Sequence, residues 1–394
     1  MNLALLVNGF PDRERPHYGV FNQRAATELS KHVHLTVLVP MAMRPGRLRV
    51  KEEEHEGISV MRVAAPMIPG MDRLNLRLFH AFLRGPLDSC LKRSDIVHSV
   101  GVEFAGLLAA ALGRRHDYCH VTQIINDLRC LKRPGFDRYP FLETLRERVN
   151  GIVCNSRALE ETARRFFPGT SLVRTAYRGA DLACFSPDGP RAAALAGRGI
   201  RFLFIGGIPA YSGRQYGANT KGGLTLMDAW RRAEGRLASV GATLFFGGPG
   251  SDGGRVSGWR ATLQHPESVL VGGIVRPQDV PGYLRAADMV LIPSLEEGCP
   301  NVAFEALASG RAVVGSDIGP LVEILGDGQC GLTVKAGDAR AWEDALVALA
   351  MPDGIGRIRA MGAAARKRAE TLYDHRDYAR RLLEIYREAC GSAG

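Results

Sequence analysis

Two glutamates, Glu297 and Glu305, lie eight residues apart in the segment PSLEEGCPNVAFEALASG, residues 293–310. Turn and capping residues such as Ser294 fill its first half and strong helix formers fill its second, so we expect a helix to begin near Asn301. The free N–H groups and partial positive charge of a helix N-terminus suit a phosphate or diphosphate. A carboxylate about one turn further in, at Glu305, can accept two ribose hydroxyls. The spacing therefore predicts a nucleotide-sugar site.

With its flanking residues, this segment resembles the donor site of retaining GT-B glycosyltransferases of the group 1 type, in which seven residues separate two glutamates. Many of these enzymes transfer a hexose from a UDP- or GDP-sugar. The resemblance implies that Glu297 binds sugar hydroxyls and the developing cation, and that Glu305 holds the donor. It also implies donor contacts by the residues that follow Glu297, which are Gly298, Cys299, Pro300, Asn301 and Val302.

The cations expected around the leaving diphosphate depart from the family pattern. In relatives an Arg follows the strand that ends here at Gly206, and a Lys-Gly pair comes a few residues later. Gly207 occupies the Arg position in this chain, whereas Lys221 and Gly222 match the Lys-Gly pair. Arg214, in the glycine-rich stretch between them, is a candidate substitute. Without it, the negative charge that develops on the diphosphate is less well stabilised.

Four further positions are candidate donor contacts by the same resemblance. Gly19 precedes a helix expected at Val20 and is the position where the first loop can approach the phosphates; a simple helix N-cap turn is the alternative. Gly248, in FFGGPGSD, corresponds to a glycine turn that faces the nucleotide. Val275 and Arg276 would lie beside the base and read it largely through backbone groups, although Arg276 is equally consistent with a solvated loop.

On the acceptor side, the strand ending in QIIND carries Asn126 and Asp127 where many relatives have a His that touches the transferred sugar. Asp127 is a candidate for holding the acceptor or a sugar hydroxyl, and an Asx turn that caps the next helix is the alternative. The nearby histidines, His98, His116 and His120, cannot be assigned to a site from sequence spacing.

The resemblance implies retention of anomeric configuration, by attack on the face from which the diphosphate departs. No aspartate cluster of the DxD type with a metal role is visible, so we expect a metal-independent reaction without a cofactor, with the nucleotide sugar as substrate. We expect a role in cell-envelope, exopolysaccharide or glycoconjugate assembly, on a glycan, lipid-linked or small-molecule acceptor. A GT-B nucleotide-sugar epimerase and a catalytically weak GT-B partner subunit are alternatives; Gly207 and Asn126 favour the second.

The elements that must position these residues form an α/β pattern. Short aliphatic runs alternate with helical patterns, as in parallel sheets covered by helices. The first series of expected strands is 3–7, 33–39, 96–99, 121–125, 152–155 and 172–174, and the second is 201–205, 243–246, 268–271, 289–292 and 312–315.

The break between the two series is the proline- and glycine-containing stretch 186–199. We therefore predict a GT-B architecture of two doubly wound, Rossmann-like domains facing across a cleft. Residues 1–186 form the acceptor-binding domain, residues 187–375 form the nucleotide-sugar-binding domain, and a helix over about 376–394 packs back onto the first. The stretch 178–185 resembles the hinge of the family and is expected to be structural.

Charge and composition indicate the setting. Residues 1–186 hold 27 Lys and Arg against 19 Asp and Glu, a net charge of +8, which leaves +2 of the total +10 for the remainder. A basic acceptor domain suits an anionic membrane face. The amphipathic segment 74–87 is a candidate contact, with an ordinary surface helix as the alternative. No nucleic-acid recognition motif is apparent.

Eight scattered cysteines without a CxxC pair argue against a zinc site and a disulfide framework, and favour a reducing compartment. No secretory signal and no apolar run of about 18 residues is visible. We therefore expect a cytoplasmic protein, with peripheral binding at the inner face of the membrane as an option.

Overall fold

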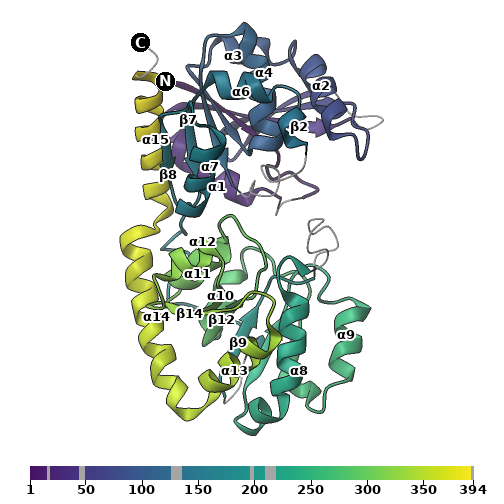
Figure 1. The fold of residues 1–394 in the computed structure, drawn as a ribbon, viewed down its shortest axis with the longest axis vertical. Coiled ribbons are helices and arrows are strands. Elements are labelled where there is room, and N and C mark those ends of the chain that lie inside the picture. The colour runs from purple at the N-terminus through teal and green to yellow at the C-terminus, as the bar shows by residue number, and fades with distance from the viewer. Residues whose placement is uncertain (16–17, 44–48, 126–134, 196–198, 209–218, 392–394) are drawn as a thin grey trace. The chain divides into compact units, whose positions relative to one another are not determined.

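The computed structural model describes residues 1–15, 18–43, 49–125, 135–195, 199–208 and 219–391. The chain divides into an N-terminal unit, Met1–Arg178 with Arg376–Gly394, and a C-terminal unit, Gly179–His375 (Figure 1). The first boundary therefore falls eight residues before the predicted position at 186. The reason is local: the backbone N–H of Ala180 donates to the carbonyl of Tyr373 at 2.8 Å, so this stretch is bonded into the C-terminal unit.

The N-terminal unit is built on an eight-stranded sheet in the order β3-β4-β2-β1-β5-β6-β7-β8. All neighbouring strands are parallel except β3, which pairs antiparallel with β4. The bounds are β1 Asn2–Val7, β2 His34–Ala42, β3 Val50–His55, β4 Ile58–Ala65, β5 Ile96–Val100, β6 Cys119–Ile124, β7 Val149–Cys154 and β8 Val173–Thr175.

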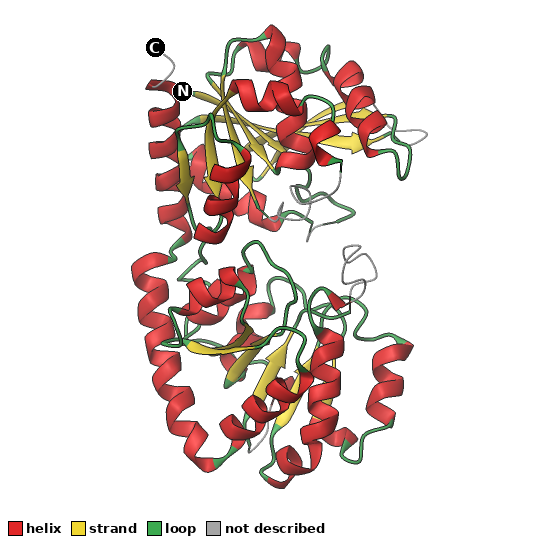
Figure 2. Cartoon of the chain, in the orientation of Figure 1, coloured by secondary structure: helices red, strands yellow, loops and turns green. Residues whose placement is uncertain are grey.

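Helices cover both faces of this sheet (Figure 2). They are α1 Val20–Ser30, α2 Asp72–Leu83, α3 Asp88–Lys92, α4 Leu107–Leu112, α6 Leu142–Arg148, α7 Arg157–Phe166 and α15 His375–Gly391, with a π turn at Val102–Gly106 and 3₁₀ turns at Gly113–Arg115 and Phe136–Arg138. The C-terminal helix α15 is amphipathic. It buries one face, including Tyr378, Leu382 and Tyr386, in the same core cluster as β1 and β2. Burial of this face fixes the C-terminal helix to the N-terminal unit.

The C-terminal unit contains a parallel sheet of six strands in the order β11-β10-β9-β12-β13-β14. The strands are β9 Arg201–Phe204, β10 Thr243–Phe246, β11 Val269–Val271, β12 Met289–Ile292, β13 Ala312–Ser316 and β14 Gly331–Val334. The helices are α8 Gly223–Ser239, α9 Gly254–Ala261, α10 Val280–Ala286, α11 Asn301–Ala308, α12 Gly319–Leu325, α13 Ala339–Ala350 and α14 Pro352–Leu372, with 3₁₀ turns at Ala193–Leu195 and Pro266–Ser268.

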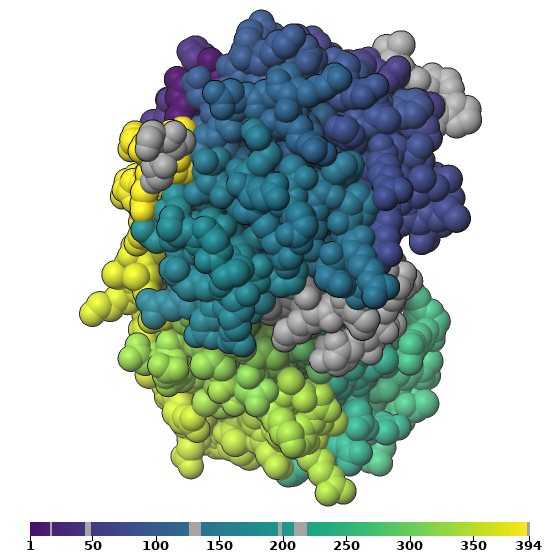
Figure 3. Space-filling model, turned by 45° about the horizontal axis from the view of Figure 1, so that its top comes forward, coloured from purple at the N-terminus to yellow at the C-terminus, as the bar shows by residue number. Residues whose placement is uncertain are grey.

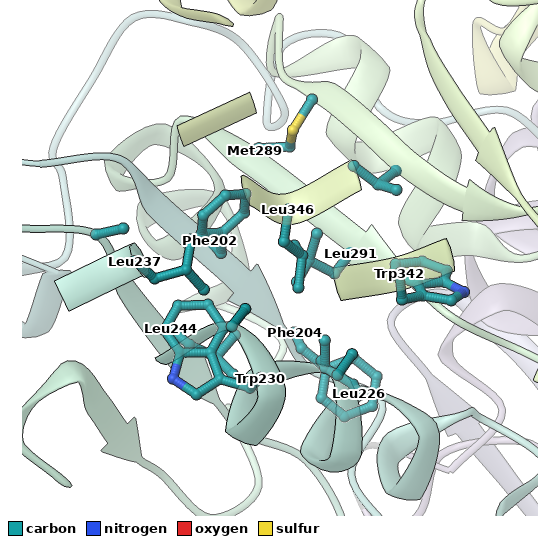
Figure 4. Packing of buried hydrophobic residues seen from close by; sticks show 14 of the residues in the cluster. Phe202, Phe204, Leu226, Trp230, Leu237, Leu244, Met289, Leu291, Trp342 and Leu346 are labelled. Atoms are coloured by element: carbon teal, nitrogen blue, oxygen red, sulfur yellow. The ribbon is translucent and has the colours of Figure 1, made fainter. Parts of the chain in front are cut away.

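The core of the C-terminal unit lies between its sheet and the helices α8 and α13 (Figure 4). Phe202 and Phe204 of β9 pack there with Trp230 of α8 and Trp342 of α13, and both tryptophans are completely buried. This packing holds the strands rigidly, so the loops at the ends of the strands have fixed starting points.

The two sheets confirm the predicted α/β fold class. Three strands, β3, β4 and β14, were not among those expected from the sequence. Strand β3 has the sequence VKEEEH, whose charges resemble a solvent-facing loop; it forms because the turn at Glu56 and Gly57, both with positive φ, folds it back onto β4. Among the described residues, no helix combines the length and the apolar character needed to cross a bilayer.

Candidate functional site

The predicted chemistry lies at the carboxyl ends of β9 and β12. β9 and β12 are neighbours at the centre of the C-terminal sheet. From β9 the chain adds β10 and β11 on one side, and from β12 it adds β13 and β14 on the other side. In open α/β sheets, ligands bind at such a reversal of strand order, beyond the carboxyl ends of the strands. Lys221 follows β9 and Glu297 follows β12, so the two side chains flank this reversal.

Lys221 and Glu297 form an ion pair, with 2.6 Å between Lys221 Nζ and Glu297 Oε1. The Glu297 side chain is buried at 8% exposure, whereas the Lys221 side chain is 41% exposed. The carboxylate is therefore fixed and the ammonium is accessible. The sequence placed both residues in the site, and the fold brings them together from positions 76 residues apart.

Ser294 also binds Glu297, although its place in the sequence predicts only a turn or capping residue. Its buried hydroxyl donates to Glu297 Oε1 at 2.9 Å. Both partners thus use the same oxygen, and Glu297 Oε2 makes no hydrogen bond with the residues that the structure describes. A Ser three residues before a buried Glu, in a loop between strand and helix, was the available signal for this role.

Helix α11 begins at Asn301, as predicted, and has Pro300 at its N-cap without a side-chain cap. No acidic residue lies in its first turn. No side chain therefore caps or offsets the positive end of α11, which lies next to the loop that carries Gly298 and Cys299. Glu305 lies in the second turn and is half-buried, so it faces away from the core formed by its neighbours in α11.

Lys221 is held in place by two contacts between its loop and the loop after β12. The backbone N–H of Leu295 donates to the carbonyl of Thr220 at 2.9 Å. Gly222 has φ +73°, and a Cβ there would lie 1.7 Å from the carbonyl oxygen of Pro293. The Gly after Lys221 is thus required for the two loops to approach, which explains the Lys-Gly pair in physical terms.

Gly207 has a structural requirement of its own. Its φ is +63°, and a Cβ there would lie 2.3 Å from the carbonyl oxygen of Pro249. The turn is closed by Ile208, whose N–H donates to that carbonyl at 2.7 Å. A side chain at position 207, where relatives carry Arg, therefore cannot be accommodated without moving this turn.

Gly248 belongs to the same set of loops. It has φ +110°, and a Cβ there would lie 2.5 Å from the carbonyl oxygen of Ile205. Its N–H donates to the carbonyl of Gly273 at 2.9 Å. The loops after β9, β10 and β11 thus pack backbone against backbone, so the structure places the two predicted glycines, Gly207 and Gly248, side by side.

Arg276 is exposed and paired with a neighbour. Its Nε donates to Asp279 at 2.7 Å, its side chain is 71% exposed, and this hydrogen bond raises the pKa of the guanidinium. The side chain is therefore engaged in a local turn, and Val275 beside it is half-buried. A base contact at these two positions would be made through the backbone.

In the N-terminal unit, Gly19 is the N-cap of α1 and has φ +78°. A Cβ there would lie 2.4 Å from the carbonyl oxygen of Gly9, so the turn is tight. Strand order in this sheet reverses between β1 and β5, and the loop that ends at Gly19 follows β1. Gly19 is thus the N-cap of α1 and also ends a loop at the edge where strand order reverses. The two interpretations of Gly19 are therefore compatible.

The histidines near the acceptor motif are interior residues. Burial lowers the pKa of His98 to about 3 and that of His120 to about 3. His116 is also buried, and its ring lies 3.4 Å from Asp88. Asp127 and Arg214, both named as catalytic candidates from the sequence, lie outside the described residues, as does Asn126. Within the described part of the chain, no group of three or more His, Cys, Asp or Glu could hold a metal ion.

The chain is similar in sequence to known glycosyltransferases. Residues 207–351 match the family model described as "Glycosyl transferases group 1". The D-inositol 3-phosphate glycosyltransferase of Saccharomonospora viridis is 31% identical over 245 residues, which cover 58% of this chain and 53% of the relative. The corresponding protein of Salinispora arenicola is 30% identical over 238 residues, covering 58% and 52%. The chain thus spans about half the length of the curated relatives it matches.

Solved structures match the whole chain at low sequence identity. A sucrose-phosphate synthase from Thermosynechococcus elongatus has a TM-score of 0.77 at 18% identity, with 100% of both chains covered. HepE from Anabaena, in complex with UDP, has a TM-score of 0.70 at 14% identity, with 98% of this chain and 99% of the other covered. At these identities the likeness concerns the fold, and it confirms the predicted GT-B architecture.

Proposed function

We propose that this protein is a retaining glycosyltransferase. The proposal starts from the GT-B fold of the chain and from the match of residues 207–351 to the group 1 glycosyltransferase family model. The proposed donor is a UDP- or GDP-hexose, and the acceptor is a glycan, a lipid-linked sugar or another glycoconjugate. The observation that carries the proposal is the Lys221–Glu297 pair at the strand-order reversal of the C-terminal unit. It joins a cation and a carboxylate where a nucleotide diphosphate and its sugar would meet.

Lys221 is assigned to the leaving diphosphate. Cleavage of the glycosidic bond builds negative charge on the phosphate oxygens, and preorganised cations and helix-end N–H groups stabilise that charge. The accessible ammonium can exchange the Glu297 carboxylate for a phosphate oxygen, while the uncapped N-terminus of α11 supplies the backbone donors. The site thereby gathers positive charge on one side of the anomeric carbon.

Glu297 is assigned to the sugar. Ser294 and Lys221 hold its Oε1, which leaves Oε2 to accept a hydroxyl of the hexose. When Lys221 moves to the diphosphate, its ammonium no longer offsets the negative charge of the carboxylate, which then lies close to a carbon that is becoming cationic. Glu305, one turn into α11, is assigned to the ribose hydroxyls of the nucleotide.

The proposed reaction retains configuration, with attack on the face from which the diphosphate leaves and with the phosphate as acceptor of the proton. Lys221 and the helix N-terminus supply positive charge at the position that a metal ion would otherwise take, so we propose that no metal is required. Activity that survives a chelator, and is not increased by added Mg²⁺ or Mn²⁺, is the expected result.

The proposed acceptor binds the basic N-terminal unit. A lipid-linked acceptor is presented at a bilayer surface, so a peripheral contact with an anionic membrane is part of the proposal. We propose a cytoplasmic location at or near the inner face of that membrane. The cysteines in the described ranges form no disulfide, which suits a reducing compartment.

The first experiment is a thermal-shift and calorimetric panel of UDP, GDP, ADP and their common sugar conjugates, with Glu305→Ala as control. A ligand that binds the native state raises the melting temperature. One nucleotide class that stabilises the wild type and not Glu305→Ala would support the donor assignment. Hydrolysis or transfer of the stabilising sugar nucleotide would then establish turnover.

A second candidate is a catalytically weak GT-B partner subunit, and Gly207 favours it. The turn geometry at Gly207 leaves no room for the cation that relatives place there. Donor binding without measurable hydrolysis or transfer, at enzyme concentrations up to those of the donor, would support this candidate. Interconversion of the free nucleotide sugar to an epimer would instead support the epimerase.

A further inference from the structure

Exposed apolar side chains of the N-terminal unit gather in one loop. The loop joins β4 to α2, and Met67, Ile68 and Met71 within it are 53%, 42% and 52% exposed; Leu74, in the first turn of α2, is 41% exposed. These are four of the ten large hydrophobic side chains that are exposed among the described residues, and they fall within eight positions. Figure 3 shows the α2 region, in indigo, on the outer surface of its unit. We call residues 67–74 the apolar loop.

The rest of α2 does not contribute this surface. Its apolar face, with Leu76, Phe79 and Leu83, is buried in the core of the unit. The predicted membrane contact over 74–87 is thus an ordinary amphipathic surface helix for most of its length, and the exposed apolar side chains lie before it. The structure moves the candidate contact to the apolar loop.

The apolar loop is held in a fixed, outward conformation. Asn75 is buried, and its side-chain amide both accepts from the N–H and donates to the carbonyl of Ile68, each at 2.8 Å. The N–H of Met71 donates to the same carbonyl at 3.2 Å, and Gly70, with φ +79°, turns the chain between them. A hydrogen-bonded turn that holds several apolar side chains in water is typical of an interaction surface.

Three arginines on or beside α2 have no carboxylate partner in the described part of the chain. Arg77 is exposed on α2 one turn after Leu74, and Arg84 is exposed at the C-cap of the helix. Arg49 stacks on Phe82 near that end of α2, with its guanidinium 5.1 Å from the ring centroid. The one acidic residue of α2, Asp72, accepts a hydrogen bond from Tyr139.

His80 lies on α2 close to two of the basic residues of this unit. Burial lowers the pKa of His80, and the nearby charges of Arg84 and Arg115 lower it further. His80 itself is therefore uncharged near neutral pH, and the positive charge in this part of α2 comes from the arginines around it.

We propose that the apolar loop inserts into the interface of an anionic phospholipid bilayer, with Arg77 and Arg84 contacting the lipid headgroups. Apolar side chains beside unpaired arginines match the two layers of such a surface, acyl chain and anionic headgroup. An apolar protein partner would not need the arginines, and a second copy of this unit would place two basic surfaces against each other. The proposal deepens the membrane contact of the proposed function, and its readout does not require glycosyl transfer.

The experiment is flotation of the purified full chain with vesicles of phosphatidylcholine alone or mixed with phosphatidylglycerol. The wild type should bind only the mixed vesicles, and binding should fall as salt rises from about 0.05 M to about 0.5 M. Replacing Met67, Ile68 and Met71 together with Ser should weaken binding by roughly tenfold or more. Arg77→Gln with Arg84→Gln should weaken it by a comparable factor and reduce its salt dependence.

Matched controls come from the C-terminal unit. Ile274, Ile355 and Leu372 are 61%, 39% and 45% exposed, and Arg357 and Arg359 are exposed without a partner in the described ranges. Changing the first three to Ser, or the two arginines to Gln, should alter vesicle binding by less than about twofold. Equal binding to neutral vesicles, wild-type binding by both loop variants, or self-association that the Ser variant abolishes without any vesicle binding would each overturn the proposal.

Discussion

The two units place their polar groups in opposite ways. The C-terminal unit holds Lys221 and Glu297 at the open edge of its sheet, where Lys221 is accessible and Glu297 keeps one oxygen without a partner in the described ranges. The N-terminal unit buries polar groups inside its sheet. There His98 Nδ1 lies 2.5 Å from the hydroxyl of Tyr386, and the hydroxyl of Ser99 lies 2.9 Å from His120 Nε2.

The difference separates residues that are available to a ligand from residues that hold the fold. In the N-terminal unit, Gln123 donates to Asn155 at 2.5 Å and to the hydroxyl of Tyr378 at 2.8 Å. Tyr378 and Tyr386 both belong to α15, so these bonds fasten the C-terminal helix to the sheet. In the N-terminal unit even the atoms without a described partner, such as His98 Nε2 and Asn155 Nδ2, are buried, so these groups specify a structure. Groups beside an accessible cation at a strand-order reversal can instead change partners when a ligand arrives.

The largest expected effect is on catalysis at the open edge. Glu297→Gln removes the charge and keeps the shape, so donor hydrolysis or transfer should fall by about 10²–10³ in kcat. The melting temperature should change little, because the partners of the carboxylate among the described residues are an accessible Lys and Ser294. Initial rates and thermal unfolding on the same preparations measure both quantities.

Glu267→Gln is the matched control, since this carboxylate lies in the same unit and is 74% exposed. Its rate should equal that of the wild type within about twofold. A Glu297→Gln protein that retained the full rate, or that unfolded at a much lower temperature with Glu267→Gln unaffected, would show that Glu297 belongs with the fold-holding residues.

Acid should destabilise the N-terminal unit first. Burial lowers the pKa of both His98 and His120 to about 3, below the value of about 6.5 for an unfolded histidine. Below pH 6.5 the two histidines are protonated in the unfolded chain but stay neutral in the folded unit. The free energy of unfolding therefore falls as pH falls. Two such groups change the free energy of unfolding by up to about 2.7 kcal/mol per pH unit.

Hydrogen exchange at pH 7 and pH 5.5, corrected for the intrinsic rate, tests this order. Amides of β5 and β6 should lose protection, while those of β12 and β13 should not, because the described histidines of the C-terminal unit, His265 and His375, are not buried. His120→Gln should reduce this pH dependence by about half. Earlier opening of β12 and β13 would contradict the assignment.

Gly207→Ala should lower the stability of the C-terminal unit, at the turn after β9. The substitution forces a Cβ into a residue with φ +63° and against Pro249, so we expect a loss of about 2 kcal/mol in the free energy of unfolding. Gly235→Ala in α8 is the control: a Cβ there has nothing within 4 Å, and a helical Ala should stabilise by about 0.5–1 kcal/mol. Denaturant unfolding measures both; a neutral Gly207→Ala would show that the turn can relax and could admit an Arg.

These residues also show how far the sequence alone predicts the protein. The aliphatic runs sufficed for the fold class, because they are local patterns, and the Glu297–Glu305 spacing gives a site that stays a prediction. The burial of His98 could not be predicted, because it depends on which segments the sheet brings together. The position of Ser294 three residues before Glu297 was a local signal that the sequence interpretation missed. Strand β3 was missed because its charged sequence is accommodated only by its edge position beside β4.

The smallest effect is expected at Ser294, which combines the two kinds of residue: it is buried, yet its hydroxyl bonds to the proposed catalytic carboxylate. Ser294→Ala removes one hydrogen bond, so kcat should fall by roughly fivefold to tenfold, corresponding to about 1 kcal/mol. The KM for the donor should stay nearly constant if Ser294 only orients Glu297. Ser294→Thr keeps the hydroxyl and should recover most of the rate, because the donor atom is what matters. If Thr fails to rescue and the melting temperature falls equally in both variants, Ser294 serves only packing, and Lys221 alone orients the carboxylate.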